Sequence, residues 1–220
     1  MSLKVTEIFH SIQGESSFAG WPCVFIRLTG CNLRCSYCDT PYAYEEGEDK
    51  TIPEILKATA RYRTPLVEVT GGEPLLQKET PLLLKRLLER RYTVLLETNG
   101  SLDISQVPKR CVRIVDIKCP SSGMSRHNNL KNLDRLTRRD EVKFVIGNRN
   151  DFTFAKRLIR RIVKDPATKP PSSPRSIHLA PVFGALDPRE LAQWILEDRL
   201  PVHLQLQIHK LLWPPNTRGV

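Results

Sequence analysis

Residues 24–38 read VFIRLTGCNLRCSYC, a short apolar run followed closely by three cysteines spaced as CxxxCxxC. The run at 24–28 is typical of a buried strand. Cys31, Cys35 and Cys38 then fall on one loop after that strand, and three thiolates so placed can hold three corners of a cubane iron–sulfur cluster. Electron-transfer clusters usually have four cysteine ligands, so a missing fourth ligand indicates chemistry at an open iron.

A zinc site is the alternative interpretation of these cysteines. Structural zinc is held by four Cys or His ligands, and Cys23 lies just upstream where it could complete such a set. The spacing alone leaves the cluster and the zinc site open. If the cluster is correct, Cys23, Cys111 and Cys119 are buried thiols without a ligand role.

Composition limits the class of protein. The 220 residues are 40% hydrophobic and 26% charged, which fits one globular domain over residues 1–220. Because no long apolar run and no signal-peptide pattern are present, we expect a cytoplasmic protein whose thiols stay reduced. The net charge of +10 is spread along the chain without interleaved aromatic residues, so we expect neither a nucleic-acid nor a membrane partner.

Strand-like and helix-like segments alternate along the chain. This order predicts an α/β fold with a mainly parallel sheet of about six strands and right-handed crossovers. At this length an open, incomplete (β/α) barrel is favoured over a closed eight-fold one. Strands are expected at 24–28, 66–70, 93–98, 112–118, 142–146, 177–180 and 202–207, and helices at about 51–61, 80–91, 151–164 and 187–197.

Two stretches interrupt this alternation. Residues 119–140 are polar and rich in Ser and Asn, and residues 165–175 read DPATKPPSSPR. Both patterns are typical of loops, so we expect two loop insertions in a single domain rather than a domain boundary.

Glycine-rich or polar signatures follow several of the expected strands. They are TGGEP at 70–74, ETNG at 97–100, and Asp116 with Lys118. Each has a simple structural explanation: TGGEP and ETNG could each form only a turn, and Asp116 and Lys118 could form a charge pair on one face of a strand. Ligands of parallel α/β folds bind at the carboxyl ends of the strands, however, so their convergence on one edge predicts an active site.

The cysteine motif, with Tyr37 before its last cysteine and GGEP at strand spacing after it, resembles the radical S-adenosylmethionine (SAM) superfamily. The resemblance implies a 4Fe–4S cluster on Cys31, Cys35 and Cys38, with SAM bound at the open iron. One electron then cleaves SAM, and the 5′-deoxyadenosyl radical takes a hydrogen from the substrate; the protein positions the reactants. The residues that the resemblance places at SAM are Tyr37, Cys38, Asp39, Gly72, Lys118, Cys119 and Pro120.

Further segments resemble one family within it, the 7-carboxy-7-deazaguanine synthases. They are FHSIQGES at 9–16, FIRLTGCNL at 25–33, CDT at 38–40, ETNG at 97–100 and QIHK at 207–210. This family converts 6-carboxy-5,6,7,8-tetrahydropterin to 7-carboxy-7-deazaguanine with loss of ammonia, on the route to queuosine. The resemblance also implies Mg²⁺ at Thr40, a homodimer, and a flavodoxin- or ferredoxin-like electron donor.

The residues that the resemblance places at the substrate fit its chemistry. Gln13 and Glu15 can hydrogen-bond the amino-pyrimidinone edge, and Arg27 can clamp the carboxylate with two bonds. Residues 211–220 extend beyond the matching segments, which leaves the role of Val220 open. The full set at the substrate is Ile12, Gln13, Gly14, Glu15, Arg27, Thr70 and His209.

Two rival functions follow from the same residues. A glycyl-radical activase acting on a protein partner would share the cysteine, GGEP and Asp116/Lys118 signatures. The set formed by Gln13, Glu15, Arg27 and Thr40 argues against it, because a macromolecular substrate does not need them. The second rival is a zinc-dependent protein that uses Cys23 and binds RNA through its positive charge.

Overall fold

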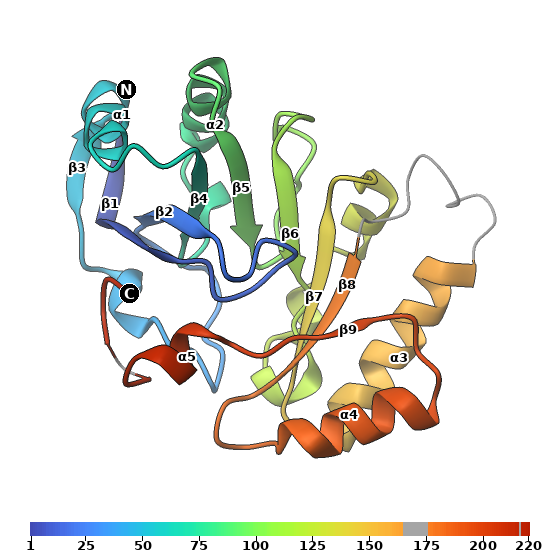
Figure 1. Ribbon diagram of the computed structural model, residues 1–220. Coiled ribbons are helices and arrows are strands. Elements are labelled where there is room, and N and C mark those ends of the chain that lie inside the picture. The colour runs from blue at the N-terminus through green and yellow to red at the C-terminus, as the bar shows by residue number, and fades with distance from the viewer. Residues whose placement is uncertain (165–175, 216) are drawn as a thin grey trace.

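A single curved sheet organises the computed structural model, which describes residues 1–164, 176–215 and 217–220 (Figure 1). Within these residues the strand order is β3-β1-β2-β4-β5-β6-β7-β8-β9. All neighbours from β2 to β9 pair in parallel, whereas β1 pairs with β2 and β3 in antiparallel fashion. The strands are β1 (Ser2–Ile12), β2 (Pro22–Leu28), β3 (Glu48–Thr51), β4 (Leu66–Gly71), β5 (Thr93–Thr98), β6 (Val112–Asp116), β7 (Glu141–Ile146), β8 (Ser176–Pro181) and β9 (His203–Leu204).

The sheet does not close, because β3 and β9 remain as its two edges. The expected open α/β barrel with a mainly parallel sheet is therefore confirmed. The prediction missed β1 and β3. The sequence of β1, SLKVTEIFHSI, places charged residues between the apolar ones because an antiparallel strand near an edge buries fewer of its side chains. It thus lacks the continuous apolar run that marks the parallel strands.

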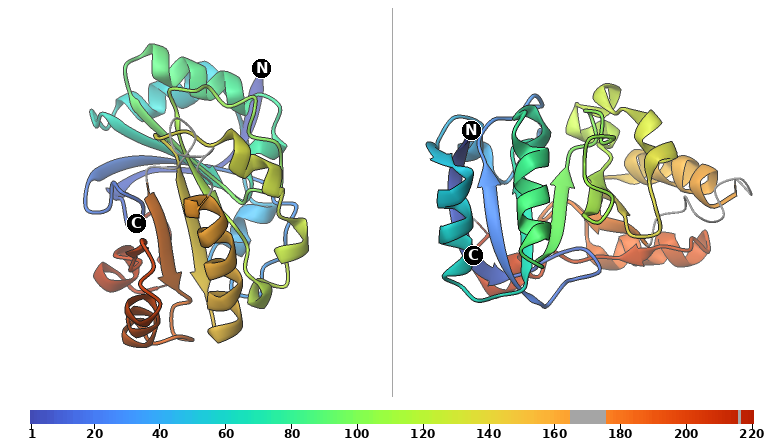
Figure 2. Two further views of the ribbon diagram at one scale, coloured as in Figure 1. Left: turned by 90° about the vertical axis from the view of Figure 1, so that its right-hand side faces the viewer. Right: turned by 90° about the horizontal axis from the view of Figure 1, so that it is seen from above.

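Helices cover the outer face of the curved sheet (Figure 2). Thr51 begins the first of them with the expected capping box, in which Thr51 and Glu54 satisfy each other's backbone N–H groups. The four predicted helices are confirmed with shifts of a few residues at their ends. The helices are α1 (Ile52–Ala60), α2 (Thr80–Glu89), α3 (Arg149–Lys164), α4 (Pro188–Glu197) and the short α5 (His209–Leu212). No helix among the described residues is long and apolar enough to cross a membrane.

The two expected loop insertions have different outcomes. Residues 119–140 fold into three short 3₁₀ helices, Pro120–Ser122, Ser125–His127 and Leu130–Arg135, rather than into an irregular loop. Leu133 and Leu136 of this stretch are buried against the sheet, which explains why it is ordered. Residues 165–175 lie outside the described residues.

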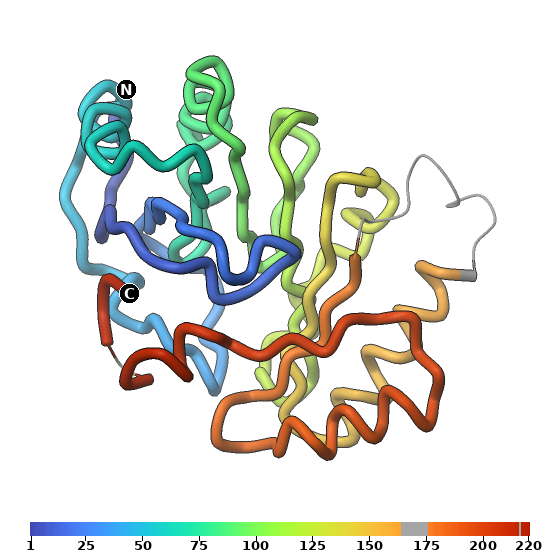
Figure 3. Tube along the Cα trace, viewed as in Figure 1, coloured from blue at the N-terminus to red at the C-terminus, as the bar shows by residue number. Residues whose placement is uncertain are grey.

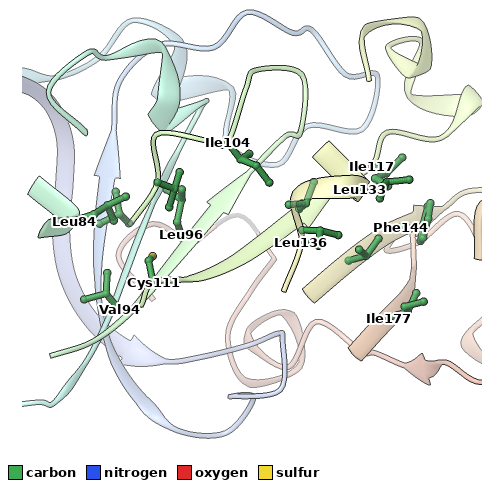
Figure 4. Packing of buried hydrophobic residues seen from close by; sticks show 14 of the residues in the cluster. Leu84, Val94, Leu96, Ile104, Cys111, Ile117, Leu133, Leu136, Phe144 and Ile177 are labelled. Carbon is green, nitrogen blue, oxygen red and sulfur yellow. The ribbon is translucent and has the colours of Figure 1, made fainter. Parts of the chain in front are cut away.

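Each parallel strand divides its side chains between two environments, because successive side chains point to opposite faces. One set faces the helices and builds the main core, as Leu96 on β5 and Phe144 on β7 do (Figure 4). The other set faces the concave side. Near the amino ends of the strands this inner set is apolar: Phe25, Leu66 and Leu95 form a second cluster with Phe9, Cys23, Val112 and Ile114.

Toward the carboxyl ends of the strands the inner side chains become polar. On β4, for example, Leu66 is followed at alternate positions by Glu68 and Thr70. Arg27, Glu97 and Lys143 stand at comparable positions on β2, β5 and β7. The apolar layer therefore supports a charged one, and the charged layer opens toward the loops.

The C-terminal segment crosses this open end. After β9 the chain passes α5 and returns toward the segment that follows the cysteine loop (Figure 3). Arg218 donates to Glu46 over 2.7 Å, and its guanidinium lies 3.9 Å from the centroid of the Tyr42 ring. The C-terminal segment thus meets residues 42–46, which follow the cysteine loop.

A buried ion pair fixes the turn after the 3₁₀ helix Leu130–Arg135 to the sheet. Arg113 on β6 is 4% exposed and Asp140 is fully buried. The Asp140 carboxylate accepts from the Arg113 backbone N–H over 3.0 Å and from the guanidinium Nε over 2.9 Å. It also accepts from the backbone and hydroxyl of Thr137 over 2.6 and 2.8 Å.

Replacing Asp140 by Ala should lower the free energy of unfolding by about 3–5 kcal/mol, because it leaves a buried guanidinium without its partner. Urea unfolding measures the change. Glu89→Ala is the control, because it breaks the exposed Arg86–Glu89 pair on α2 and should cost less than about 1 kcal/mol. Equal losses in the two variants would contradict the importance of the buried pair.

Candidate active site

A pocket lies at the carboxyl ends of β2 and β4–β7, where the polar signatures of the sequence were expected to meet. The cysteine loop forms one wall, and the turn after β1 forms another. Thr217 and Val220 reach the pocket from the C-terminal segment. The predicted site residues that line it are Ile12, Gln13, Gly14, Glu15, Arg27, Cys31, Cys35, Tyr37, Cys38, Asp39, Thr40, Thr70, Gly72, Lys118 and His209.

Cys119 and Pro120 are the predicted site residues that do not line the pocket. Cys119 is fully buried in the core between the sheet and the helices, and burial raises the pKa of its thiol. Pro120 begins the first 3₁₀ helix of the 119–140 stretch. Neither Cys119 nor Pro120 therefore forms part of the pocket lining.

Two glycines let the GGEP segment lie directly against the start of the cysteine loop. A Cβ on Gly71 would stand 2.1 Å from the Leu28 carbonyl oxygen, and Gly71 has a φ of +151°. A Cβ on Gly72 would stand 2.2 Å from the Gly30 carbonyl oxygen. The Gly72 N–H donates to Leu28 over 3.2 Å. The glycines therefore permit contact between two backbone segments, and that contact sets the position of the cysteine loop.

Glu73 extends this contact to β5. Its buried carboxylate accepts from the Asn99 backbone N–H over 2.7 Å, from the Leu75 backbone N–H over 2.9 Å and from the Thr98 hydroxyl. Burial raises the pKa of Glu73, and these donors oppose the rise. Glu73 thus joins the GGEP and ETNG segments, so both signatures serve one structural purpose at the pocket edge.

The three cysteines of the motif share one pocket wall. Burial raises the pKa of the Cys31 and Cys35 thiols, so binding a metal there must displace protons. No three His, Cys, Asp or Glu side chains of the described residues are close enough to hold a single metal ion. A cluster that spreads its thiolates around several irons fits such a wall better than one zinc ion does.

The position of Cys23 argues against the zinc site. Cys23 packs with Phe25 and Leu66 in the apolar layer below the pocket, and it is fully buried. Burial raises the pKa of its thiol. The four-cysteine set of the zinc interpretation is therefore not formed, and Cys111 is likewise a buried core thiol.

A cation stands beside the cysteine wall. Lys118 donates to Asp116 over 2.8 Å, and both side chains line the pocket. Burial alone would lower the pKa of Lys118, but Asp116 outweighs it and the pKa is raised. Lys118 therefore stays charged. Tyr37 lies on the same side, where its hydroxyl donates to the Val145 carbonyl over 3.4 Å.

Arg27 occupies the opposite side of the pocket. It points inward from β2, and its Nε donates to Glu7 over 2.7 Å. Its guanidinium lies 5.7 Å from the centroid of the Phe9 ring and 5.9 Å from that of Tyr42. Among the described residues its hydrogen bonds use Nε alone, so both terminal nitrogens remain available for an anionic ligand.

A buried lysine organises the centre of the pocket. Lys143 on β7 donates to Glu15 over 2.6 Å and to Glu97 over 2.9 Å. Burial alone would lower the pKa of Lys143, but Glu15 and Glu97 raise it well above its ordinary value. Lys143 in turn holds the pKa of Glu97 down against the effect of burial. Thr70 also donates to Glu97, over 3.4 Å.

The C-terminal segment attaches to both walls. Lys210 pairs with Asp39 of the cysteine loop over 2.7 Å, and this partner lowers the pKa of Asp39 against the opposing effect of burial. His209 lies against Gly14, where a Cβ would stand 2.1 Å from its Nδ1. Burial lowers the pKa of His209, so its imidazole is neutral near pH 7. His178 and His203 stack on each other and do not line the pocket.

Sequence reasoning missed three side chains that shape the pocket: Glu7, Glu68 and Lys143. A detectable signal existed for two of them. Glu68 is the single charge in the run LVEVTG, and Lys143 lies between apolar residues in EVKFVI, where burial of a charge requires a reason. Glu7 could not be found in this way, because β1 itself was not predicted.

Comparison with known proteins agrees with this geometry. The family model described as Radical SAM superfamily matches residues 25–164. A 7-carboxy-7-deazaguanine synthase of Chlorobaculum tepidum is 49% identical over 99% of this chain and 97% of its own length. The synthase of Koribacter versatilis is 43% identical over 99% of this chain and its full length.

A solved structure shares the fold. The crystal structure of QueE from Escherichia coli matches with a TM-score of 0.76 at 24% identity, over 94% of both chains. Together, the matching family model and the extended identity show that the chain belongs to the radical SAM superfamily and, within it, to the family of 7-carboxy-7-deazaguanine synthases.

Proposed function

We propose that this chain is a carbon–nitrogen lyase that converts 6-carboxy-5,6,7,8-tetrahydropterin to 7-carboxy-7-deazaguanine and ammonia. One observation carries the proposal: a single pocket joins a wall of three thiols to a polar wall built around Arg27, Glu15 and Lys143. The two synthases to which the chain is similar over nearly its whole length support it. Neither the relatives nor the pocket favours the glycyl-radical activase.

Membership of the superfamily implies SAM and a 4Fe–4S cluster. We assign the cluster to Cys31, Cys35 and Cys38. When bound, the cluster would supply the electron for the cleavage of SAM, and the pocket would hold the pterin with its C6 placed to lose a hydrogen atom. Lys118, held cationic by Asp116, suits the carboxylate of the methionine moiety, and Tyr37 suits the adenine.

The polar wall fits the substrate. The terminal nitrogens of Arg27 can take the pterin carboxylate with two parallel bonds, while Glu7 keeps the guanidinium in place. Glu15 offers its Oε1, a buried oxygen without a partner among the described residues, to the N–H groups of the amino-pyrimidinone edge. Ile12, Gly14, Thr70 and His209 complete the surroundings of the substrate in this proposal.

Thr40 is the proposed protein ligand of Mg²⁺. It precedes the 3₁₀ helix Pro41–Tyr44, yet its hydroxyl makes no capping hydrogen bond there and lies 3.9 Å from the Cys38 sulfur. Magnesium commonly takes few protein ligands and completes its shell with water and substrate oxygens. The nearby pterin carboxylate would supply such oxygens.

Two partners belong to the proposal. A flavodoxin- or ferredoxin-like protein would provide the electron, as the family resemblance implies. The chain would also act as a homodimer. In support, β9 is an edge strand with Leu204 exposed, and Leu206 and Leu211 after it are exposed as well.

Anaerobic turnover tests the function directly. With a reconstituted cluster, SAM, Mg²⁺, a reductant and 6-carboxytetrahydropterin, the protein should form one ammonia for each deazapurine, without any partner polypeptide as substrate. Mass spectrometry and an ammonia assay measure the two products. SAM binding without deazapurine formation would refute the assignment.

The cysteine assignment predicts a sharp division among the six thiols. Cys31→Ala, Cys35→Ala and Cys38→Ala should each lose most cluster iron, absorption near about 400 nm and activity, because no spare thiol lines the pocket wall. Cys111→Ala is the matched control, since that thiol is buried in the core. Iron analysis after reconstitution measures the result; equal iron loss in the control would contradict the assignment.

Arg27→Met should raise KM for the carboxypterin by about 10–100-fold, because it removes a charge-assisted bond to the carboxylate. A pterin without that carboxylate should bind both proteins with similar, weak affinity. Steady-state kinetics and competitive inhibition measure the two effects. If the variant weakens both ligands equally, Arg27 does not act on the carboxylate.

A further inference from the structure

The amide of Gln13 is engaged at both ends. Its Nε2 donates to Glu68 Oε2 over 2.5 Å, and its Oε1 accepts from the Glu15 backbone N–H over 3.2 Å. Gln13 is 4% exposed and Glu68 is 3% exposed, so water competes little for either bond. The side chain of Gln13 is therefore committed within the protein, unlike the direct substrate contact expected from the sequence.

This arrangement fixes the turn that carries Glu15. The Glu15 N–H can only donate, so the Gln13 oxygen must face it and the Gln13 NH₂ faces Glu68. The Glu15 carboxylate is then held from a second direction, because its Oε2 accepts from Lys143 over 2.6 Å. Its Oε1 is left buried and without a partner among the described residues.

We propose that Glu68 is a positioning residue for substrate recognition: through Gln13 it holds the Glu15 carboxylate in the orientation that receives the amino-pyrimidinone edge of the substrate. The inference rests on the proposed function and deepens it. It assigns Gln13 to the support of Glu15 rather than to the substrate itself.

The charges around Glu68 show which property of its side chain matters. Glu97, Glu15 and Lys143 face it within the pocket, and Cys23 lies on the neighbouring strand. Burial and the nearby Glu97 raise the pKa of Glu68 well above its ordinary value, although the Gln13 bond and Lys143 oppose the rise. This shift favours the uncharged form of Glu68, and in the proposal its Oε2 serves as a hydrogen-bond acceptor for Gln13 rather than as a charge.

Two substitutions separate the acceptor from the charge. Glu68→Gln keeps the shape and an acceptor oxygen but has no ionisable proton. Glu68→Leu removes the acceptor and leaves the Gln13 NH₂ buried without a partner. In the proposal, Glu68→Leu raises KM for the pterin about 10–100-fold, whereas Glu68→Gln stays within about 3-fold and keeps the wild-type pH profile of kcat/KM.

A second glutamate serves as the matched control. Glu141 is also buried on the inner face, two residues before Lys143 on β7. Its carboxylate accepts from the backbone N–H of Ser17, in the loop that carries Glu15, over 3.0 Å. It does not line the pocket. If Glu68 merely stabilised this loop, Glu141→Gln would raise KM for the pterin as Glu68→Leu does; in the proposal it lowers thermal stability and leaves that KM within about 3-fold.

The experiment uses the reconstituted holoenzyme and measures kcat, KM for the pterin and the affinity for SAM. Wild-type turnover is established first, because its absence would refute the function rather than this inference. SAM affinity, which should remain unchanged in all variants, shows that the pocket is folded. If Glu68→Leu does not fold, Gln13→Met removes the same bond and should raise KM equally; the double variant of Gln13→Met and Glu68→Leu should be no worse than either one.

Three results would overturn the proposal: a Glu68→Leu enzyme with unchanged KM for the pterin, a Glu68→Gln enzyme as impaired as Glu68→Leu, or a Glu141→Gln enzyme with the same rise in KM. The first removes the role of Glu68. The second makes its charge the important property, and the third reduces its role to loop stability.

Discussion

The contact between two backbone segments, 28–31 and 71–73, is the constraint on which the pocket depends. Gly71 and Gly72 lie so close to the carbonyls of Leu28 and Gly30 that no side chain fits between them. This contact joins the ends of β2 and β4, and Glu73 extends it to β5. A loop of three cysteines has little regular structure of its own, so its position relative to the polar wall comes from this contact.

The polar wall depends on a second constraint, the balance of buried charge. Glu15, Glu68 and Glu97 stand close together, and Lys143 is the cation bonded to two of them. Three ionised carboxylates around one ammonium would leave two uncompensated negative charges in a site that excludes water. The raised pKa of Glu68 favours its uncharged form and so reduces this repulsion. The site can then hold one buried, unpaired acceptor oxygen on Glu15.

The sequence predicted the parallel part of the fold because each strand buries both faces and so reads as an apolar run. Convergence of the signatures at one edge followed from topology alone. The side-chain pairings within the site did not follow from the topology. The ion pair of Arg27 with Glu7 was not expected, because it arises where β1 places Glu7 opposite Arg27 across an antiparallel pair. When a strand is not predicted, the contacts that it makes are not predicted either. The register between strands that are distant in the sequence cannot be inferred from the local sequence of either one.

The same limit applies to Gln13, whose amide is bonded to Glu68 and to the Glu15 backbone. A motif identifies which residues gather at a site, but it does not say which of them touch the ligand and which hold the others. That division depends on which side chains from other strands lie next to the motif, on the side away from the ligand. Behind Gln13 stands Glu68, contributed by a strand 55 positions away. In our proposal Glu68 takes the amide of Gln13 while Glu15 keeps an unpaired oxygen for the substrate, so a residue outside the motif contributes to selectivity.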